Sequence, residues 1–181
     1  MRPFLKINDQ ISLHLPHPEI AEDIFQAVAS QRPYLRQWLP WVDGTKSVQN
    51  ILDFIHESME KNKAGTQLTT FIYNGSELAG SIGLVKFDKD HQMAEIGYWL
   101  HQNMQQQGIM TKTCQGFIDF VFRTKALNRI EIRVASENIK SQAIPKRLGF
   151  THEGTLRERL LMYQKFHDLE LFSLLRREWA K

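Results

Sequence analysis

Residues 95–113 read EIGYWLHQNMQQQGIMTKT: an apolar run, a polar segment with a single glycine, and the start of a second apolar pattern. The run at 95–100 belongs to a segment, 93–100, that predicts a strand. Beyond Gly108 the apolar residues Met110, Cys114, Phe117 and Val121 recur at helical spacing, which predicts a helix. The stretch therefore predicts a strand, a short polar loop and a helix, in that order.

The glycine and the lysine between threonines suggest a phosphate-binding loop, but two common nucleotide motifs do not fit. Aligning the lysine of the P-loop G-x-x-x-x-G-K-[ST] on Lys112 places Gln106 and Thr111 where both glycines belong. The dinucleotide motif G-x-G-x-x-G fails because Gly108 has no glycine partners at those spacings. The sequence thus argues against a nucleoside triphosphatase and against a dinucleotide-binding domain.

A strand that leads through a short loop into a helix can still bind an anion. The free N–H groups of the loop and of the first helical turn converge on one point, and the positive end of the helix dipole points there too. Gly108 would allow close approach because it has no β-carbon. We therefore predict that this loop can hold a diphosphate without a lysine.

Length and composition indicate one ordinary globular domain, residues 1–181. The chain of 181 residues is 42% hydrophobic and 24% charged, with a net charge of +3 and one cysteine. No apolar run reaches the roughly 20 residues that span a bilayer, and no signal peptide is recognisable. A single cysteine fits a reducing compartment, so we expect a cytoplasmic protein with no membrane partner and no direct nucleic-acid partner.

The remaining periodicities predict a mixed α/β (α+β) domain in which helices precede strands. The expected helices lie at 17–30, within 32–44, at 47–61, after Gly108 and at 138–149. The expected strands are 11–15, two strands within 67–87 around Asn74-Gly75, then 93–100, 128–135, 150–161 and 167–179.

Three apolar groups are expected in the core. The helix at 47–61 should bury the stripe formed by Val48, Ile51, Leu52, Ile55 and Met59. Cys114 should pack in the core rather than act as a nucleophile. Trp38 and Trp41 are expected to pack as well, the alternative being that they line an acceptor pocket.

The glycine loop resembles motif A of the GCN5-related N-acetyltransferase (GNAT) superfamily, [QR]-x-x-G-x-[GA], read here as residues 105–110. Met110 departs from the family's Gly or Ala. Residues 137–158 resemble the second family signature, with Asn138 and Ser141 followed by Leu148-Gly149-Phe150 and Glu153-Gly154. The segments YLRQWLPW and HDLELFSLLRREW are similar to the ribosomal-protein N-terminal acetyltransferase branch, the RimJ/RimL type.

This resemblance covers nearly the whole chain and implies a GNAT acyl-CoA N-acyltransferase fold, a mixed central sheet of about seven strands flanked by helices. It implies transfer of the acetyl group of acetyl-CoA to a primary amine, foremost the N-terminal α-amine of a ribosomal protein. The alternatives are a small amine (polyamine, amino acid or aminoglycoside) and a non-catalytic CoA-binding module. The branch also suggests a homo-oligomer.

Two residues are candidates for catalysis. Glu95, on the strand before the loop, is the candidate base, because the attacking amine must lose a proton; the alternative is a carboxylate on a solvent face. Ser141 is the candidate that contacts the thiol sulfur or relays a proton to it; the alternative is a helix N-terminal hydroxyl bonded to its own backbone. Pro145 stands where other family members place a tyrosine acid, which this chain therefore lacks.

The resemblance also implies a set of cofactor contacts. Backbone groups of Tyr98 and Leu100 should pair with the pantetheine arm as an added strand would. Asn138 should reach a pantetheine amide or cap its helix. The residues expected around the diphosphate are Gln105, Gln106, Gln107, Gly108, Ile109, Met110 and Thr111. The seven histidines show no metal-ligand spacing, so no metal is expected.

Overall fold

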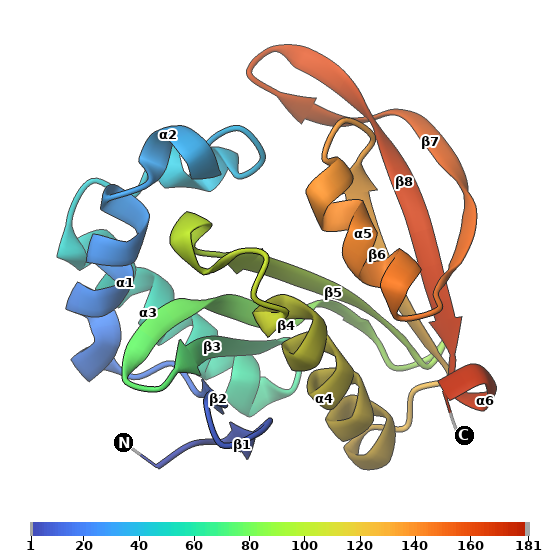
Figure 1. The fold of residues 1–181 in the computed structure, drawn as a ribbon, viewed down its shortest axis with the longest axis horizontal. Coiled ribbons are helices and arrows are strands. Elements are labelled where there is room, and N and C mark those ends of the chain that lie inside the picture. The colour runs from blue at the N-terminus through green and yellow to red at the C-terminus, as the bar shows by residue number, and fades with distance from the viewer. Residues whose placement is uncertain (1, 180–181) are drawn as a thin grey trace. The chain divides into compact units, whose positions relative to one another are not determined.

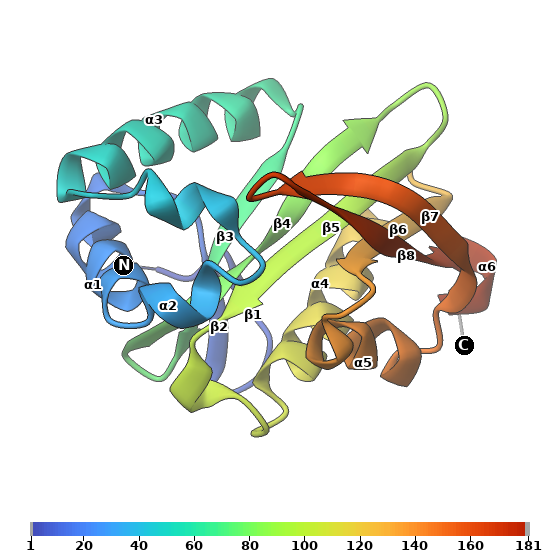
Figure 2. The same ribbon diagram turned by 90° about the horizontal axis from the view of Figure 1, so that it is seen from above.

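The computed structural model describes residues 2–179 (Figures 1 and 2). The strands are β1 (Leu5–Lys6), β2 (Ile11–His14), β3 (Leu68–Asn74), β4 (Glu77–Asp88), β5 (Met93–Leu100), β6 (Arg129–Ala135), β7 (Thr151–Met162) and β8 (Lys165–Leu175). The α-helices are α1 (Ala21–Ala29), α2 (Arg32–Leu35), α3 (Val48–Ala64), α4 (Ile109–Thr124), α5 (Ile139–Arg147) and α6 (Arg176–Trp179). Single 3-10 turns are η1 (Pro18–Ile20), η2 (Pro40–Asp43) and η3 (Gln102–Met104).

The strands form one mixed sheet in the order β1-β2-β3-β4-β5-β6-β8-β7. Strands β1 and β2, β2 and β3, β6 and β8, and β7 and β8 pair in antiparallel fashion, whereas β5 and β6 are parallel. The chain divides into two compact units. Unit 1 comprises the residues up to Gly83 and Tyr98–Thr113, and unit 2 comprises Leu84–Gly97 and the residues from Cys114 onward. Strands β4 and β5 contribute to both units.

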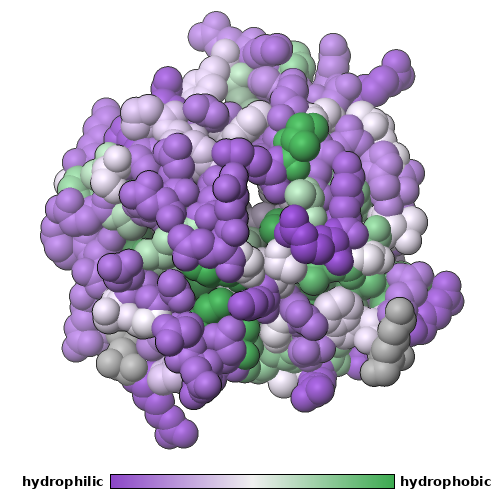
Figure 3. Space-filling view, in the orientation of Figure 1, coloured by the Kyte–Doolittle hydropathy of each residue, from purple (hydrophilic) through white to green (hydrophobic). Residues whose placement is uncertain are grey.

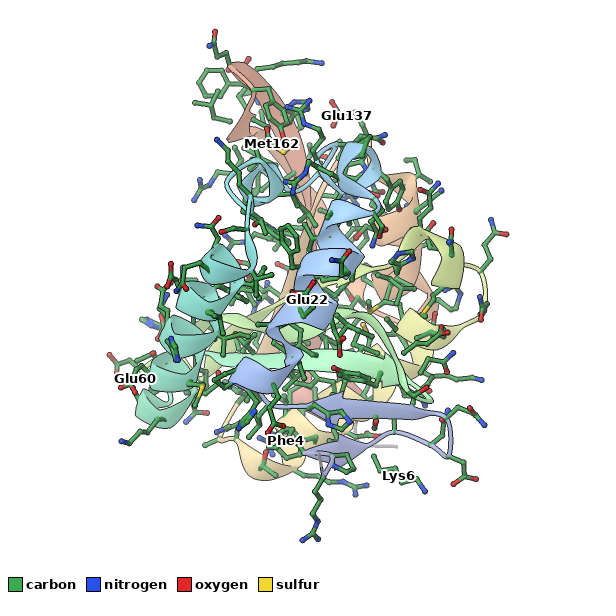
Figure 4. The ribbon with its side chains drawn as sticks, turned by 90° about the vertical axis from the view of Figure 1, so that its left-hand side faces the viewer. Phe4, Lys6, Glu22, Glu60, Glu137 and Met162 are labelled. Atoms are coloured by element: carbon green, nitrogen blue, oxygen red, sulfur yellow. The ribbon has the colours of Figure 1, made fainter. Side chains whose placement is uncertain are left out.

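In unit 1, helices α1 and α3 contact each other, and α3 also contacts β3. Ile24 and Val28 of α1 and Ile51 and Ile55 of α3 are buried in one cluster with Phe71 of β3. Figure 4 shows Glu22 on α1 and Glu60 on α3 with their side chains directed outward, and both residues are exposed. Each helix is thus amphipathic, with its apolar side against the sheet.

The predicted apolar stripe of α3 is wrong at its last member. Met59 is exposed, whereas its neighbour Ser58 is buried at 3% exposure. At 3.6 residues per turn, position 58 follows Ile51 and Ile55 on the inner side more closely than position 59 does. The geometry of the helix therefore overrides the hydrophobicity of the methionine.

Gly80 on β4 marks a very close approach of two backbones in unit 1. A β-carbon placed there would lie 2.1 Å from the carbonyl oxygen of Trp99. Gly80→Ala is therefore expected to lower the free energy of unfolding by about 2 kcal/mol or more, as overpacking does. Urea denaturation measures this loss. Gly44→Ala is the control, because the nearest atom to its β-carbon is 3.4 Å away; an equal loss in both variants would contradict the prediction.

Unit 2 contains the C-terminal hairpin β7–β8, whose strand β8 also pairs with β6. Helix α5 contacts β6 and β8, and Figure 1 shows it alongside them. Its end follows the prediction: the Gly149 N–H donates to the Lys146 carbonyl and the Phe150 N–H to the Pro145 carbonyl. This double closure is a Schellman-type cap, with Phe150 and Pro145 both buried.

Two other expectations need correction. The final segment at 176–179 is helix α6, not the end of a strand. The Leu175 N–H donates to the Glu178 carboxylate, which caps the new helix and stops the strand. Trp41 is 45% exposed, so the expectation that it packs in the core is wrong. Its ring lies 6.4 Å from the ring of Trp99 in unit 1, and Trp38 is half-buried.

The mixed α/β fold with helices flanking a central sheet is confirmed, and residues 2–179 form eight strands where about seven were expected. The additional strand is β1, which is two residues long. Cys114 is fully buried, as expected. The face drawn in Figure 3 is mostly hydrophilic, with small scattered hydrophobic areas.

Among residues 2–179, no helix combines the length and the apolar character that crossing a bilayer demands. In the same part of the chain, no three His, Cys, Asp or Glu side chains gather closely enough to hold a metal ion.

Candidate active site

The turn before helix α4 is held in place by contacts within unit 1. The buried Gln31 accepts a hydrogen bond of 2.8 Å from the Gln102 N–H through its side-chain oxygen. The Gln105 side-chain amide donates to the hydroxyl of Tyr34 on α2. The Gln107 amide donates to the Asn103 carbonyl at 3.1 Å. Two of the three consecutive glutamines therefore brace the loop with their side chains.

The middle of this turn presents backbone donors to its surroundings. Gln106, Gln107 and Gly108 are exposed, and Gln106 and Gly108 have left-handed φ values of 63° and 74°. Within residues 2–179, the backbone N–H groups of residues 106–110 donate to no protein acceptor. The first helical bond at this end runs from the Lys112 N–H to the Gly108 carbonyl at 3.0 Å. Such a row of donors at a helix N-terminus is suited to an anion with several oxygens.

The side chains at the start of α4 point away from this exposed turn. Ile109 and Met110 are 4% and 6% exposed, so both lie in the core. A β-carbon on Gly108 would have only the Lys112 side chain nearby, at 3.9 Å, so the glycine is favoured by its left-handed φ and not by lack of space. Met110, the departure from the motif, thus fills the interior and leaves the donors uncovered.

Tyr98 and Leu100 lie at the end of β5 in unit 1 and are both half-buried. The next residue, His101, donates its N–H to the Ala79 carbonyl on β4 at 2.7 Å. This bond ties the end of β5 to its neighbour just before the turn. The role of Tyr98 and Leu100 in pairing with a pantetheine arm stays a prediction.

Glu95 lies in unit 2, at the point where the pairing of β5 with β6 ends. The described parallel ladder runs from Met93↔Arg129 to Glu95↔Glu131. The Glu95 side chain is 21% exposed, and burial raises its pKa, although Arg133 acts in the opposite direction. The Glu95 side chain is therefore largely covered, which argues against the alternative of a carboxylate on a solvent face. A carboxylate whose proton affinity is increased by burial is a better base.

The face of β6 that carries Glu131 is charged. Glu131 is 5% exposed and accepts 2.8 Å hydrogen bonds from Arg129 and Arg133, the residues two positions before and after it. Arg129 also donates twice to Glu153 on β7. The bonds from Arg129, followed by that from Ser173, lower the pKa of Glu153 to about 2. An ion-pair network thus extends from Glu95 across β6 to β7.

Asn138 caps helix α5 in unit 2. Its side-chain oxygen accepts a 3.1 Å hydrogen bond from the Ser141 N–H. This is the capping alternative for Asn138, and it fixes the backbone of Ser141 in the first turn. The alternative, contact of Asn138 with a pantetheine amide, stays a prediction, and so does the role of the Ser141 hydroxyl at the thiol.

Asn138→Ala is expected to lower the free energy of unfolding by about 1 kcal/mol through loss of this cap. Thermal unfolding followed by circular dichroism measures the change. Asn138→Asp is the matched control, since a carboxylate oxygen can accept the same bond and should keep most of the stability. Equal melting temperatures for the alanine variant and the wild type would show that the cap contributes little.

Sequence reasoning missed the partners that surround the predicted residues. Tyr34, which receives the Gln105 amide, lies 71 residues away in the chain, and no local pattern connects the two. Arg129, Glu131 and Arg133 do leave a signal: in NRIEIRVA, charged residues alternate with apolar ones, which places all three on one face of a strand.

Comparison with known proteins agrees with this fold. The profile of the acetyltransferase (GNAT) domain family matches residues 10–151. YdaF of Bacillus subtilis (strain 168), named as a candidate ribosomal N-acetyltransferase, is 34% identical over 96% of this chain and 96% of its own. The ribosomal-protein-serine acetyltransferase of Escherichia coli (strain K12) is 24% identical over 96% of this chain and 97% of its own.

Solved structures are also similar along almost their whole length. The microcin C7 self-immunity acetyltransferase MccE, in complex with acetyl-CoA and AMP, has a TM-score of 0.93 and 27% identity and covers 97% of both chains. Together these matches confirm the resemblance to the GNAT superfamily and to its ribosomal-protein branch.

Proposed function

The chain belongs to the acetyltransferase (GNAT) domain family and is an acyltransferase, and from this premise we propose that it moves the acetyl group of acetyl-CoA to the N-terminal α-amine of a ribosomal protein. The observation that carries the proposal is the row of backbone N–H groups at residues 106–110, across the turn and the start of α4, which have no acceptor within residues 2–179. The whole chain, residues 1–181, would serve as one N-acetyltransferase domain.

The turn supports binding of the acyl donor through its diphosphate. Several aligned N–H groups and the positive end of α4 would offset the charge of the two phosphates without a lysine. Gly108 adopts a left-handed φ of 74°, which glycine accepts without steric cost, and it carries no β-carbon that would hinder the approach of a phosphate. Acetyl-CoA supplies an activated thioester, and the residues of this chain have to bind it, orient it and manage the proton of the amine.

Glu95 is proposed as the group that accepts this proton. An α-amino group has a pKa of about 7.7–8.0, so at neutral pH most acceptor molecules are protonated and cannot attack. A partly buried carboxylate with a raised pKa can take the proton directly or through one water. Ser141, held in the first turn of α5, is proposed to assist the departing thiol.

The proposal of a ribosomal-protein acceptor is supported by the relatives. YdaF and the Escherichia coli enzyme are both named for ribosomal acetylation and align along nearly the whole chain. An acceptor of this kind would place the activity in the cytoplasm. A homo-oligomer is part of the same proposal, because the branch suggests it.

An acceptor screen tests the function. The protein is incubated with acetyl-CoA and with a panel of peptides that reproduce ribosomal-protein N-termini, polyamines, amino acids and aminoglycosides, and the products are read by mass spectrometry. The expected result is a mass increase of one acetyl group on the α-amine of a subset of the peptides. N-terminally blocked peptides with a free lysine are the control for α-amine selectivity.

Acetylation of small amines alone would overturn the acceptor assignment. Binding of acetyl-CoA without any acetylated product would favour the non-catalytic alternative.

A further inference from the structure

Glu95 of β5, the carboxylate proposed as the base, lies next to the charged face of β6. Arg129, Glu131 and Arg133 alternate along β6, while Ile130, Ile132 and Val134 are buried on its opposite face. In the sheet, Glu131 of β6 lies between two partners in register: Glu95 of β5 on one side and Ser173 of β8 on the other. Two acidic residues of neighbouring strands therefore lie side by side, an arrangement that is unfavourable unless a cation lies between them.

Arg133 is that cation. Its Nη2 donates to Glu131 Oε2 at 2.8 Å, and its Nε lies 3.6 Å from Glu95 Oε2. Among the described residues, Arg133 Nε is buried and has no hydrogen-bond partner. The guanidinium is thus fixed by Glu131 at one end and directed toward Glu95 at the other. The contact with Glu95 is an ion pair that is too long to be a hydrogen bond.

This spacing suits a carboxylate that has to take up a proton. A short charge-assisted hydrogen bond from arginine would stabilise the ionised form and make Glu95 a poor base. An absent cation would leave Glu95 beside the Glu131 charge with nothing to hold its orientation. At 3.6 Å Arg133 orients the carboxylate through its charge and leaves the oxygen lone pairs available.

We propose that Arg133 is a positioning residue for Glu95: anchored by Glu131, it holds the Glu95 carboxylate in place and ionised for proton uptake. The inference rests on the proposed function, in which Glu95 is the base. Arg133 itself touches neither acceptor nor donor in this assignment.

The other charges that act on Glu95 come from three strands. Burial raises the pKa of Glu95, and Arg133 on β6 opposes this more than any other charge does. Glu131 on β6 raises it, whereas Lys86 on β4 and Arg159 on β7 lower it. Replacing Arg133 with a neutral residue should therefore raise the pKa of Glu95 further. The acid limb of the pH–rate profile would then move to higher pH.

The experiment compares Arg133→Gln, Arg133→Lys and wild type with an acceptor peptide and acetyl-CoA. In Arg133→Gln, kcat/KM on the acid limb should fall about tenfold and approach the wild-type value at the alkaline plateau. In Arg133→Lys the positive charge remains, but the planar guanidinium, whose separate nitrogens face Glu131 and Glu95, is lost. Its acid limb should stay near that of wild type while kcat falls severalfold with little change in KM.

Arg129→Gln is the matched control, because it removes the other partner of Glu131 from the same face of β6 and leaves Arg133 beside Glu95. It should lower stability without moving the acid limb. A direct readout is the ¹³C NMR titration of the Glu95 carboxyl group, which should shift to higher pH in Arg133→Gln and not in Arg129→Gln.

An unmoved Glu95 titration in folded Arg133→Gln would overturn the proposal. If Arg133→Gln does not fold, wild-type kcat in Arg133→Lys would overturn it equally, because the residue would then serve stability alone. Failure of the proposed function is distinguishable from both. If Glu95 is not the base, Glu95→Gln keeps its activity, whereas the NMR titration still reports whether Arg133 acts on the carboxylate.

Discussion

Glu95→Gln is expected to lower kcat by about 10²- to 10⁴-fold, the usual contribution of a general base. The amide has nearly the shape of the carboxylate but cannot accept the proton of the amine. The affinity for acetyl-CoA should change little, because the donor is assigned to the turn at 106–110 and not to Glu95. Steady-state kinetics with an N-terminal peptide measures the first quantity, and calorimetric titration with acetyl-CoA measures the second.

The pH dependence gives this prediction a second observable. Because burial raises the pKa of Glu95 above its ordinary value of 4.5, the carboxylate becomes protonated, and the wild-type rate falls, at a pH higher than an exposed glutamate would require. The loss is on the acid side, since a base is inactive when protonated. Glu95→Gln should abolish this acid limb and leave a low rate that depends only on ionisation of the acceptor.

Glu60→Gln on α3 is the matched control, because Glu60 is exposed and the same change there should leave kcat within about twofold of wild type. A Glu95→Gln variant with kcat within threefold of wild type would remove Glu95 as the base. The family assignment would be unaffected, since it does not depend on this residue.

The segment around the loop is predictable from the sequence because its signals are local. The strand expected at 93–100 is β5, with the same bounds, and the helix expected after Gly108 is α4, which begins at Ile109. An apolar run bounded by polar residues and a glycine before a helical stripe leave few alternatives for the backbone. The turn follows from those two elements, so its exposed N–H groups could be anticipated as well.

Other parts of the fold depend on contacts between distant residues. Strand β1 has two residues and exists because Leu5 and Lys6 pair with Leu13 and Ser12 of β2, which no periodicity of two residues can reveal. The order β6-β8-β7 places the last strand inside the sheet and its predecessor at the edge, although both read as similar strands. The burial of the Trp41 side chain likewise depends on which distant segments pack against it, and its hydrophobicity alone does not determine it.

The same distinction applies to the candidate site. The sequence points to Glu95 through its place before the loop, but its burial and its pairing with Glu131 are products of strand register. Asn138 shows the reverse case: a local cap is visible in the structure, and a local hydrogen bond was the simpler of the two interpretations. The residue types in the sequence indicate which chemistry is available. The register of the strands decides which charged residues lie beside each group, and these neighbours shift its pKa.

Gly108→Asp is expected to weaken acetyl-CoA binding by about a hundredfold, the second large effect. An aspartate at this position would place a carboxylate among the N–H groups that are proposed to hold the diphosphate. Like charges brought together in a binding site cost several kcal/mol, and 1.4 kcal/mol corresponds to a factor of ten. The left-handed φ of 74° is tolerated by aspartate better than by most residues, and the position has space for a side chain. Calorimetric titration with acetyl-CoA measures the Kd.

Gly108→Asn separates charge from shape, since asparagine tolerates the same φ and has the same size. Both side chains can accept hydrogen bonds from the first turn of α4, and the helix dipole favours the aspartate, so Gly108→Asp should be at least as stable as Gly108→Asn. Compared with Gly108→Asn, the Gly108→Asp variant should thus bind acetyl-CoA more weakly without being less stable. A drop in affinity that is equal in the two variants would mean that backbone strain or bulk is responsible. Wild-type affinity in Gly108→Asp would mean that the diphosphate is bound elsewhere, because no anion would be accommodated on N–H groups that a neighbouring carboxylate already occupies.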